Sequence, residues 1–218
     1  MEYVPVTLHL YLSRQHDYRE AWDRQGASLS VQLWAGMKHI HKNEVAHLDI
    51  HTNNILIVGQ PPDKMALKFS DFGLAQRLPL DQTTQINTET YDPRARPPEL
   101  WFADRIQWTF DKPNIRRVMV QPHSCDVWAT AVVNLRLLTN KWVHDADSDA
   151  VRRHILQHCL NARVKQVPFD LREYCGRKSA MWTSLIAPYK YLAGAFSFDP
   201  KERASSDMVH TILDSMRL

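Results

Sequence analysis

Three polar residues stand beside short apolar runs, and their side chains could act together on a phosphate group. Asp49 and Asn54 lie five residues apart just before the apolar run 55–58, and Asp71 follows a second apolar run at 66–69. Two strands joined by a turn would bring Asp71 back beside Asn54. Two carboxylates and an amide oxygen suit Mg²⁺ carrying a nucleotide phosphate, and one carboxylate is left to accept a proton from a hydroxyl group.

The two motifs that hold these residues resemble the catalytic core of eukaryotic protein kinases. The family's H-R-D-x-x-x-x-N loop is similar to residues 47–54, His-Leu-Asp-Ile-His-Thr-Asn-Asn, and its D-F-G turn to Asp-Phe-Gly at 71–73. The resemblance implies that Asp49 is the catalytic base and that Asn54 and Asp71 bind Mg²⁺. The order of the motifs favours this interpretation over a solvated loop with ordinary turn residues.

Segments around this core resemble other parts of the kinase large lobe. Residues 1–12 resemble the hinge and the start of the helix after it, and Leu56 falls at the floor of the adenine site. The resemblance therefore implies that the nucleotide contacts are Glu2, Val4, Leu56 and Asp71. The apolar stripe over 27–41 predicts a helix that supports the catalytic loop, with Ser28 or Ser30 as its cap.

Two long-range contacts are implied by the second half of the chain. Residues 71–99 match an activation segment that ends in Arg-Pro-Pro-Glu, and Arg203 lies in a sequence similar to the family's D-P-x-x-R. In the family these positions form a buried ion pair, here Arg203 with Glu99. Asp126 opens an apolar helix, and its counterpart in the family hydrogen-bonds the backbone of the catalytic loop. Residues 102–123 are interpreted as an inserted surface loop.

The chain departs from the kinase pattern at three positions. Leu48 replaces the arginine that grips an activation-segment phosphate, so control by such a phosphate is not expected. His51 replaces a lysine that neutralises the transferring phosphoryl group, which makes it a further candidate catalytic residue. Asp92 falls where a threonine bonds that lysine, so His51 and Asp92 could form a substitute pair. A gap of two would put Thr90 there instead.

A second family shares part of the motif. Asp-Ile-His followed by Asn at position 54 also resembles small-molecule phosphotransferases of the aminoglycoside and choline type. Those proteins lack the Pro-Glu-Leu-Trp context at 98–101 and the Asp-Val-Trp-Ala context at 126–129. The protein-kinase resemblance is therefore preferred, and it is closest to the group that includes the cyclin-dependent kinases.

Composition bounds the remaining possibilities. The 218 residues are 44% apolar and 23% charged, as in a globular chain of one domain. The net charge is only +3 and the basic residues are scattered, which argues against nucleic acid and anionic membranes as partners. No apolar run approaches the roughly 20 residues of a membrane span. Three widely spaced cysteines (Cys125, Cys159 and Cys175) indicate free thiols and an intracellular location.

Two groups of histidines have spacings that could suit a metal site. His154 and His158 are four residues apart with Cys159 adjacent, but the surrounding charge indicates an exposed helix face. His39 and His41 are two residues apart on a helix and should point apart. Neither group is expected to bind a metal.

The expected fold is mainly α: the C-terminal lobe of a protein kinase, a helical bundle with a short β-hairpin that carries the site. The six glycines are never closer than ten residues, so no Gly-rich phosphate loop is present and only the large lobe is expected. The activity implied is transfer of phosphate from ATP, with Mg²⁺, to a serine or threonine of a protein, with this chain inactive by itself. The alternative is a pseudokinase that binds another kinase lobe, or itself, through apolar surface at 55–57.

Overall fold

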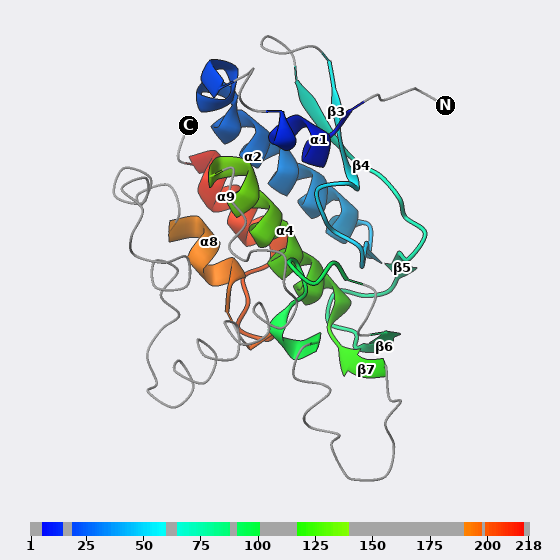
Figure 1. Ribbon diagram of the computed structural model, residues 1–218. Coiled ribbons are helices and arrows are strands. Elements are labelled where there is room, and N and C mark those ends of the chain that lie inside the picture. The colour runs from blue at the N-terminus through cyan, green and yellow to red at the C-terminus, as the bar shows by residue number, and fades with distance from the viewer. Residues whose placement is uncertain are drawn as a thin grey trace.

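The computed structural model describes residues 6–14, 19–59, 65–87, 91–100, 117–139, 190–197 and 199–215. Three helices, α2, α4 and α9, form its centre, and short strands flank them (Figure 1). The described elements follow in the order β1 (Val6–Thr7), α1 (Leu8–Ser13), α2 (Arg19–Lys42), β2 (Val45–Ala46), β3 (Ile55–Val58), β4 (Ala66–Phe69), β5 (Gln76–Arg77), β6 (Thr84–Asn87), β7 (Arg117–Val120), α4 (Pro122–Thr139), α8 (Lys190–Ala195) and α9 (Ser206–Ser215).

Helix α2 is the central support, packed against both α4 and α9. Its buried stripe includes Leu33 and Met37, as the sequence predicts, but the helix begins at Arg19 rather than near residue 27. Ser28 and Ser30 therefore lie inside the helix, and the prediction that one of them caps it is wrong. The Ser30 hydroxyl donates to the carbonyl of Gly26 at 2.9 Å, a bond to residue i−4 that a helix interior allows.

A buried polar network joins α2 to α4. The Asn134 amide donates to the Ser30 oxygen at 2.7 Å, and the Trp34 ring nitrogen donates to Asn134 Oδ1 at 2.6 Å. Each of these three residues is at most 1% exposed. Because buried polar groups must be paired to avoid a desolvation cost, this network fixes the register of the two helices as well as their contact.

The predicted hairpin is confirmed. Strands β3 and β4 pair antiparallel, with Ile55 opposite Phe69, and β1 joins the free edge of β3. Ile55 and Ile57 point into the core and are 0% and 3% exposed, whereas Leu56 is half-buried on the other face. The expectation of an exposed apolar surface over 55–57 is therefore wrong for both isoleucines, because side chains alternate along a strand and α1 packs against this one.

The predicted inserted loop at 102–123 is wrong for its last seven residues. Residues 117–120 form β7, which pairs antiparallel with β6, and α4 begins at Pro122. The helix thus starts four residues before Asp126, where the sequence interpretation placed its opening. Proline fits this place because its fixed φ suits the first turn and its missing N–H would have no partner there. Residues 101–116 lie outside the described part.

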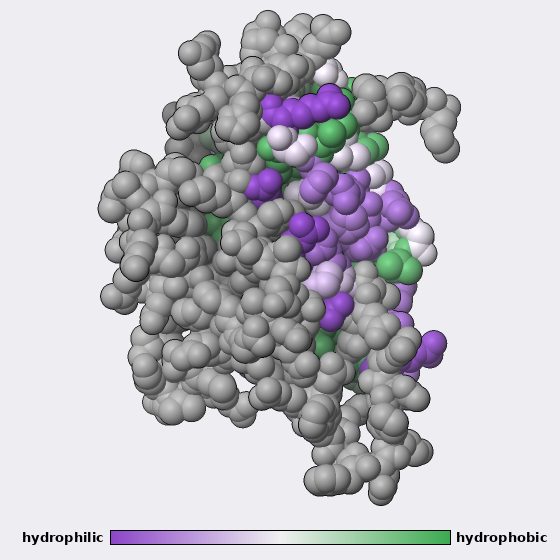
Figure 2. Space-filling model, viewed as in Figure 1, coloured by the Kyte–Doolittle hydropathy of each residue, from purple (hydrophilic) through white to green (hydrophobic). Residues whose placement is uncertain are grey.

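Caps fix the ends of two further helices. Thr7 Oγ1 accepts from the Leu10 N–H at 3.1 Å at the start of α1, and Ser205 Oγ accepts from the Met208 N–H at 3.2 Å at the start of α9. The capped helix expected from Ser205 is therefore confirmed. Among the described helices, none combines the length and apolarity that crossing a bilayer requires. Hydrophilic residues dominate the described surface on the face shown in Figure 2.

Candidate active site

Asp49 and Asn54 are held together by direct hydrogen bonds. The Asn54 Nδ2 group donates to the Asp49 carboxylate at 2.8 Å and to the Asp49 carbonyl at 3.0 Å. Asn54 is buried at 7% exposure, and Asp49 is half-buried. Because both bonds use the amide nitrogen of Asn54, its Oδ1 atom stays available to accept from another group or to bind a cation.

Asp71 is carried to the same place by the end of β4. Ser70, its neighbour, donates to the Asn54 carbonyl twice, from its N–H at 2.9 Å and from its hydroxyl at 3.0 Å. Asp71 itself has φ of 60°, and its carboxylate accepts from the Gly73 N–H at 3.3 Å. The side chain is exposed. The structure therefore brings Asp49, Asn54 and Asp71 to one end of the β3–β4 hairpin.

Asp126 anchors the loop that holds Asp49. Its carboxylate accepts from the backbone N–H groups of His47 at 2.6 Å and Leu48 at 2.9 Å, which confirms the bond expected from the family. Leu48 has φ of 67°, a left-handed conformation that is strained for a branched side chain by about 1–3 kcal/mol. The two bonds to Asp126 hold the backbone in this conformation.

Two further groups meet at the same carboxylate. The Tyr91 hydroxyl donates to Asp126 at 3.1 Å, and His41 Nε2 lies 3.4 Å from it. Burial opposes ionisation of Asp126, but His41 and the amides of Leu48 and His47 outweigh it, so its pKa lies below the usual range. Burial and the negative charge of Asp126 raise the pKa of Tyr91 well above its ordinary value. Tyr91 is therefore a neutral hydrogen-bond donor at neutral pH.

His47 couples the loop to the Asp-Phe-Gly turn. Its Nε2 atom donates to the Ser70 carbonyl at 3.0 Å, and its ring lies 4.6 Å from the ring of Phe72. Because a carbonyl only accepts, this bond places the ring proton on Nε2. Phe72 and Leu74 are 46% and 43% exposed, so the apolar surface beside the site is here rather than at 55–57.

The predicted ion pair is confirmed and buried. Arg203 donates to Glu99 through two nitrogens, at 2.7 and 2.9 Å, and its side chain is 0% exposed. It also donates to the carbonyls of Ser124 and Ser197. Burial raises the pKa of the neighbouring Cys125 thiol well above its ordinary value, and the charge of Glu99 adds to this. Cys125 is therefore a protonated, unreactive thiol.

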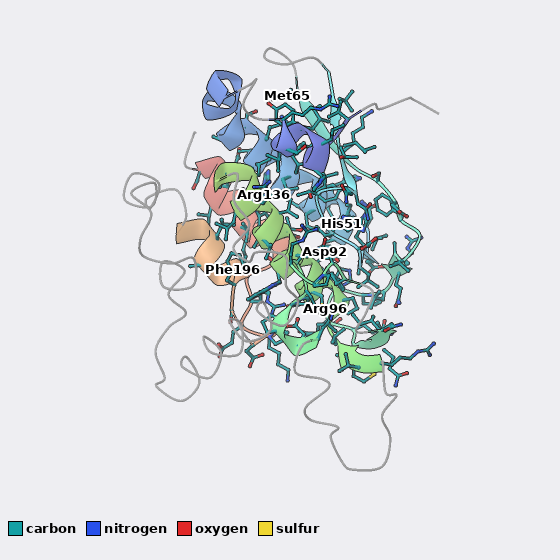
Figure 3. The ribbon with its side chains drawn as sticks, viewed as in Figure 1. His51, Met65, Asp92, Arg96, Arg136 and Phe196 are labelled. Atoms are coloured by element: carbon teal, nitrogen blue, oxygen red, sulfur yellow. The ribbon has the colours of Figure 1, made fainter. Side chains whose placement is uncertain are left out.

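The expected His51–Asp92 pair is replaced by a different pairing. Asp92 accepts from the guanidinium of Arg94 at 2.7 and 3.0 Å, and His51 Nε2 lies 3.5 Å from the Asp49 carboxylate. Burial opposes ionisation of Asp92, but Arg94 outweighs it and lowers the pKa of Asp92, with a smaller contribution from the nearby His51. His51 and Asp92 nevertheless lie near each other (Figure 3). An arginine two residues along the chain competes for Asp92 more effectively than a histidine on another loop.

The donor set fits a nucleotide-bound magnesium ion in part. Asn54 Oδ1 and the Asp71 carboxylate are hard oxygen donors, as Mg²⁺ requires, but two protein ligands need phosphate oxygens and waters to complete an octahedron. In the part of the chain described, no cluster of three or more histidines, cysteines or acids could hold a metal alone. Of the predicted adenine contacts, Leu56 is half-buried in β3, while Glu2 and Val4 lie outside the described residues, as do His154, His158 and Cys159.

His41 and Tyr91 are the site residues that sequence reasoning missed. His41 was considered only as a metal ligand, yet it is 4% exposed and bonds Ser206 at 2.9 Å through its other nitrogen. A signal was available, because His41 continues the buried series Leu33 and Met37 at a spacing of four. A histidine in that stripe must find polar partners in the core.

Comparison with known proteins identifies the family. A family model for the protein kinase domain matches residues 1–215, and the chain therefore belongs to the protein kinase family. Cyclin-dependent kinase 10 of Mus musculus is 24% identical over 200 residues, which cover 84% of this chain and 49% of that protein. Cyclin-dependent kinase 11B of Rattus norvegicus is 30% identical over 124 residues, 56% of this chain and 24% of that protein. The chain thus spans half or less of the length of these relatives.

Proposed function

We propose that this chain supplies one half of the catalytic site of a serine/threonine protein kinase, namely the general base and the Mg²⁺ ligands. Asp49 accepts the proton of a protein hydroxyl group, and Asn54 and Asp71 hold Mg²⁺. The ion, when bound, neutralises charge on the phosphates of ATP. The roles rest on the family and on one observation above all: the two bonds from the Asn54 amide nitrogen orient Asp49 and leave Asn54 Oδ1 for a cation.

His51 is proposed to assist this base. Its Nε2 atom lies 3.5 Å from Asp49, which is within reach of a tightened hydrogen bond once substrate is bound. There the imidazole would occupy the place where the kinase pattern has a lysine that neutralises charge on the transferring phosphoryl group. Leu48, whose side chain is apolar and 3% exposed, offers no grip for a phosphate on the activation segment. We therefore propose that the activity needs no such phosphorylation.

The groups that close over the phosphates of ATP are proposed to come from outside these 218 residues, on the same polypeptide or on another. No two glycines lie closer than ten residues, so a Gly-rich loop is not among them. The test uses a chimera in which a small lobe from cyclin-dependent kinase 10 is joined before residue 6. Phosphate incorporation into a protein substrate is measured for this chimera and for its Asp49→Asn variant. Loss of the base should slow transfer by about 10²–10⁴-fold.

Asp214→Asn is the matched control, because it makes the same chemical change at an exposed position of α9. It should leave the rate unchanged. Equal rates for the wild-type chimera and Asp49→Asn would refute the assignment of the base. Strong incorporation by the 218-residue chain alone, lost in Asp49→Asn, would confirm the base and refute the need for outside groups.

A second function is supported by the exposed apolar pair Phe72 and Leu74. Their exposure of 46% and 43% beside the Asp49 site suits a pseudokinase that binds the lobe of a true kinase or a second copy of itself. Such binding needs no chemistry, so Asp49→Asn should preserve it. Phe72→Ser together with Leu74→Ser should abolish it.

The measurements are light scattering of the purified chain and inhibition of a purified cyclin-dependent kinase, with the same variants side by side. Met208→Ser and Ile212→Ser form the control pair, because these residues are at least as exposed but lie on α9. A monomer that inhibits nothing would exclude the binding function. Inhibition that disappears in Asp49→Asn would point back to catalysis.

A further inference from the structure

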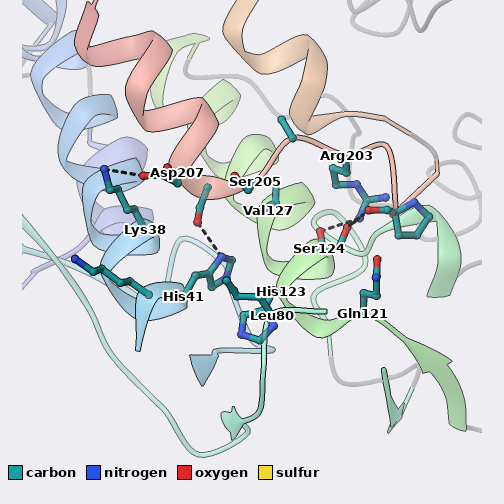
Figure 4. Close-up of a pocket in the computed structure, with 14 residues that line it drawn as sticks. Lys38, His41, Leu80, Gln121, His123, Ser124, Val127, Arg203, Ser205 and Asp207 are labelled. Carbon is teal, nitrogen blue, oxygen red and sulfur yellow. Dashed lines mark hydrogen bonds and ion pairs between the residues drawn. The ribbon is translucent and has the colours of Figure 1, made fainter. Parts of the chain in front are cut away.

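A pocket of about 570 Å³ lies away from the proposed active site, between the end of α2, the start of α4 and the start of α9 (Figure 4). None of the four residues proposed for phosphoryl transfer lines it. This volume lies in the range of small-molecule sites, which is about 300–1,000 Å³. The pocket is called the α2–α9 pocket below.

His123 is the unexplained residue of this pocket. It is only 4% exposed, and neither of its ring nitrogens has a hydrogen-bond partner among the described residues. Its neighbour His41, 4.9 Å away between ring centroids, is different because both of its nitrogens have partners, Ser206 and Asp126. A buried ring with an unused donor and an unused acceptor is costly unless something else pairs with it.

The mouth of the pocket is positively charged. Lys38 and Lys42 are one turn apart on α2, and both line the pocket. Lys38 Nζ pairs with the Asp207 carboxylate at 2.7 Å, whereas Lys42 makes no ion pair with any described residue. One carboxylate therefore faces two ammonium groups, and the first turn of α9, whose N–H groups also favour negative charge, lies beside them.

Apolar groups line the rest of the pocket. Leu80 projects from the activation segment at 55% exposure, and Val127 and Pro200 contribute from α4 and from the turn before α9. Arg203 and Ser124 also line it, but their polar atoms are already bonded to Glu99 and Pro200 respectively. The groups left for a ligand thus include an apolar wall, the two nitrogens of His123, the side-chain amide of Gln121 and the ammonium group of Lys42.

We propose that the α2–α9 pocket binds a small organic anion: a phosphate monoester or carboxylate carried by an apolar body. The anionic group lies against Lys42 and Lys38, the body against Leu80 and Val127, and a polar atom of the ligand bonds the ring of His123. Charge and apolar contact are both required, because neither inorganic phosphate nor a neutral hydrocarbon satisfies all three features.

The probe is 1-naphthyl phosphate, with 1-naphthol and inorganic phosphate as the two halves of the same molecule. Binding to the purified chain is followed without Mg²⁺ by calorimetry and by the ring ¹⁵N signals of His123, which the His123→Phe variant identifies. We expect saturable binding of 1-naphthyl phosphate in the millimolar range or tighter. Binding by either half should be at least roughly tenfold weaker, because each makes only part of the contacts.

Three substitutions test the groups separately. His123→Phe keeps an aromatic ring and removes both nitrogens, and Lys42→Gln removes the unpaired charge. Each should weaken binding about 2- to 10-fold. Asp207→Asn should strengthen binding by a similar factor, because it removes the competing carboxylate and frees Lys38. Lys42 and Asp207 are both exposed, so their variants should fold even if His123→Phe does not.

Lys68→Gln, a change of the same kind on β4, is the control and should bind as wild type does. The proposal is overturned if the dissociation constant of 1-naphthyl phosphate exceeds about 5 mM, which corresponds to a binding free energy weaker than roughly 3 kcal/mol. It is also overturned if 1-naphthol binds equally well, or if all variants bind alike.

Discussion

At the scale of single residues, the bond network around Glu99 and Arg203 leads to a stability prediction. Arg203→Ala should lower the free energy of unfolding by about 3–5 kcal/mol, because it strands the Glu99 carboxylate and two backbone carbonyls in a buried place. Urea unfolding measures the change. Arg117→Ala, at an exposed position of β7, should cost less than about 0.5 kcal/mol. Equal midpoints for the two variants would contradict the burial of the pair.

His123 should make the fold sensitive to acid. Burial, together with the positive charge that His41 can carry, lowers the pKa of His123 to about 4, from an ordinary value near 6.5; Asp126 opposes this shift. The unfolded chain takes up a proton on His123 at a higher pH than the folded protein does. The contribution of His123 to stability is therefore fully present above pH 6.5 and is lost as the pH falls to 4, by up to about 3 kcal/mol.

His123→Phe removes this titration and keeps the edge-to-face contact with the His41 ring. The difference in unfolding free energy between wild type and His123→Phe should therefore be constant above pH 6.5. It should shift in favour of the variant between pH 6.5 and 4. The measurement is urea unfolding of both proteins at several pH values. A difference that does not change with pH would show that His123 titrates normally in the folded state.

Residues with a family motif could be placed from the sequence, and residues without one could not. Asp49, Asn54 and Asp71 stand in ordered motifs, and the structure brings them together. The partner of Asp92 was missed, because pairing between side chains depends on distances that a motif does not contain. His41 and His123 were missed as a buried pair, because their contact joins residues 82 positions apart in the numbering.

At the scale of the elements, two glycines of α2 should respond in opposite ways to the same substitution. A Cβ atom on Gly36 would lie 2.6 Å from the Phe69 ring of β4, whereas on Gly26 it would meet only Leu138 at 3.9 Å. Gly26→Ala should raise the unfolding free energy by about 1 kcal/mol, the usual gain in a helix interior. Gly36→Ala should lower it by about 1–3 kcal/mol, because β4 must move away.

Thermal or urea unfolding of the two variants provides the comparison, and each variant is the control for the other. A gain at both positions would mean that the packing of α2 on β4 is looser than the contact implies. A loss at both would mean that the extra methyl group is not tolerated in the first half of α2 either.

The elements themselves were predictable where an apolar period was clear. The α2 stripe, the β3–β4 hairpin and the Ser205 cap agree with the sequence. The start of α2 and the strand β7 were missed. Strand β7 is four residues long, and it is defined by pairing with β6, about thirty residues earlier in the chain. Such a short strand is set by its partner rather than by its own sequence.

At the scale of the whole molecule, the chain should bind ATP weakly. Leu56, Asn54 and Asp71 supply only one side of a nucleotide site, and a small-molecule site normally encloses most of its ligand. Calorimetry of the 218-residue chain with Mg-ATP should give a dissociation constant well above about 1 µM. The chimera described above should bind more tightly. A micromolar constant for the chain alone would contradict this view of the site.

Because Asp126 anchors the loop of residues 47–54 to α4, unfolding of this loop should depend on unfolding of the helix. The N–H groups of His47 and Leu48 belong to a loop, yet they donate to a carboxylate that is 0% exposed and sits inside α4. Amide hydrogens are released to solvent only when their bonds break, so these two cannot exchange unless α4 separates from the loop. The loop that carries Asp49 should therefore belong to the last cooperative unit to unfold, together with the helix core.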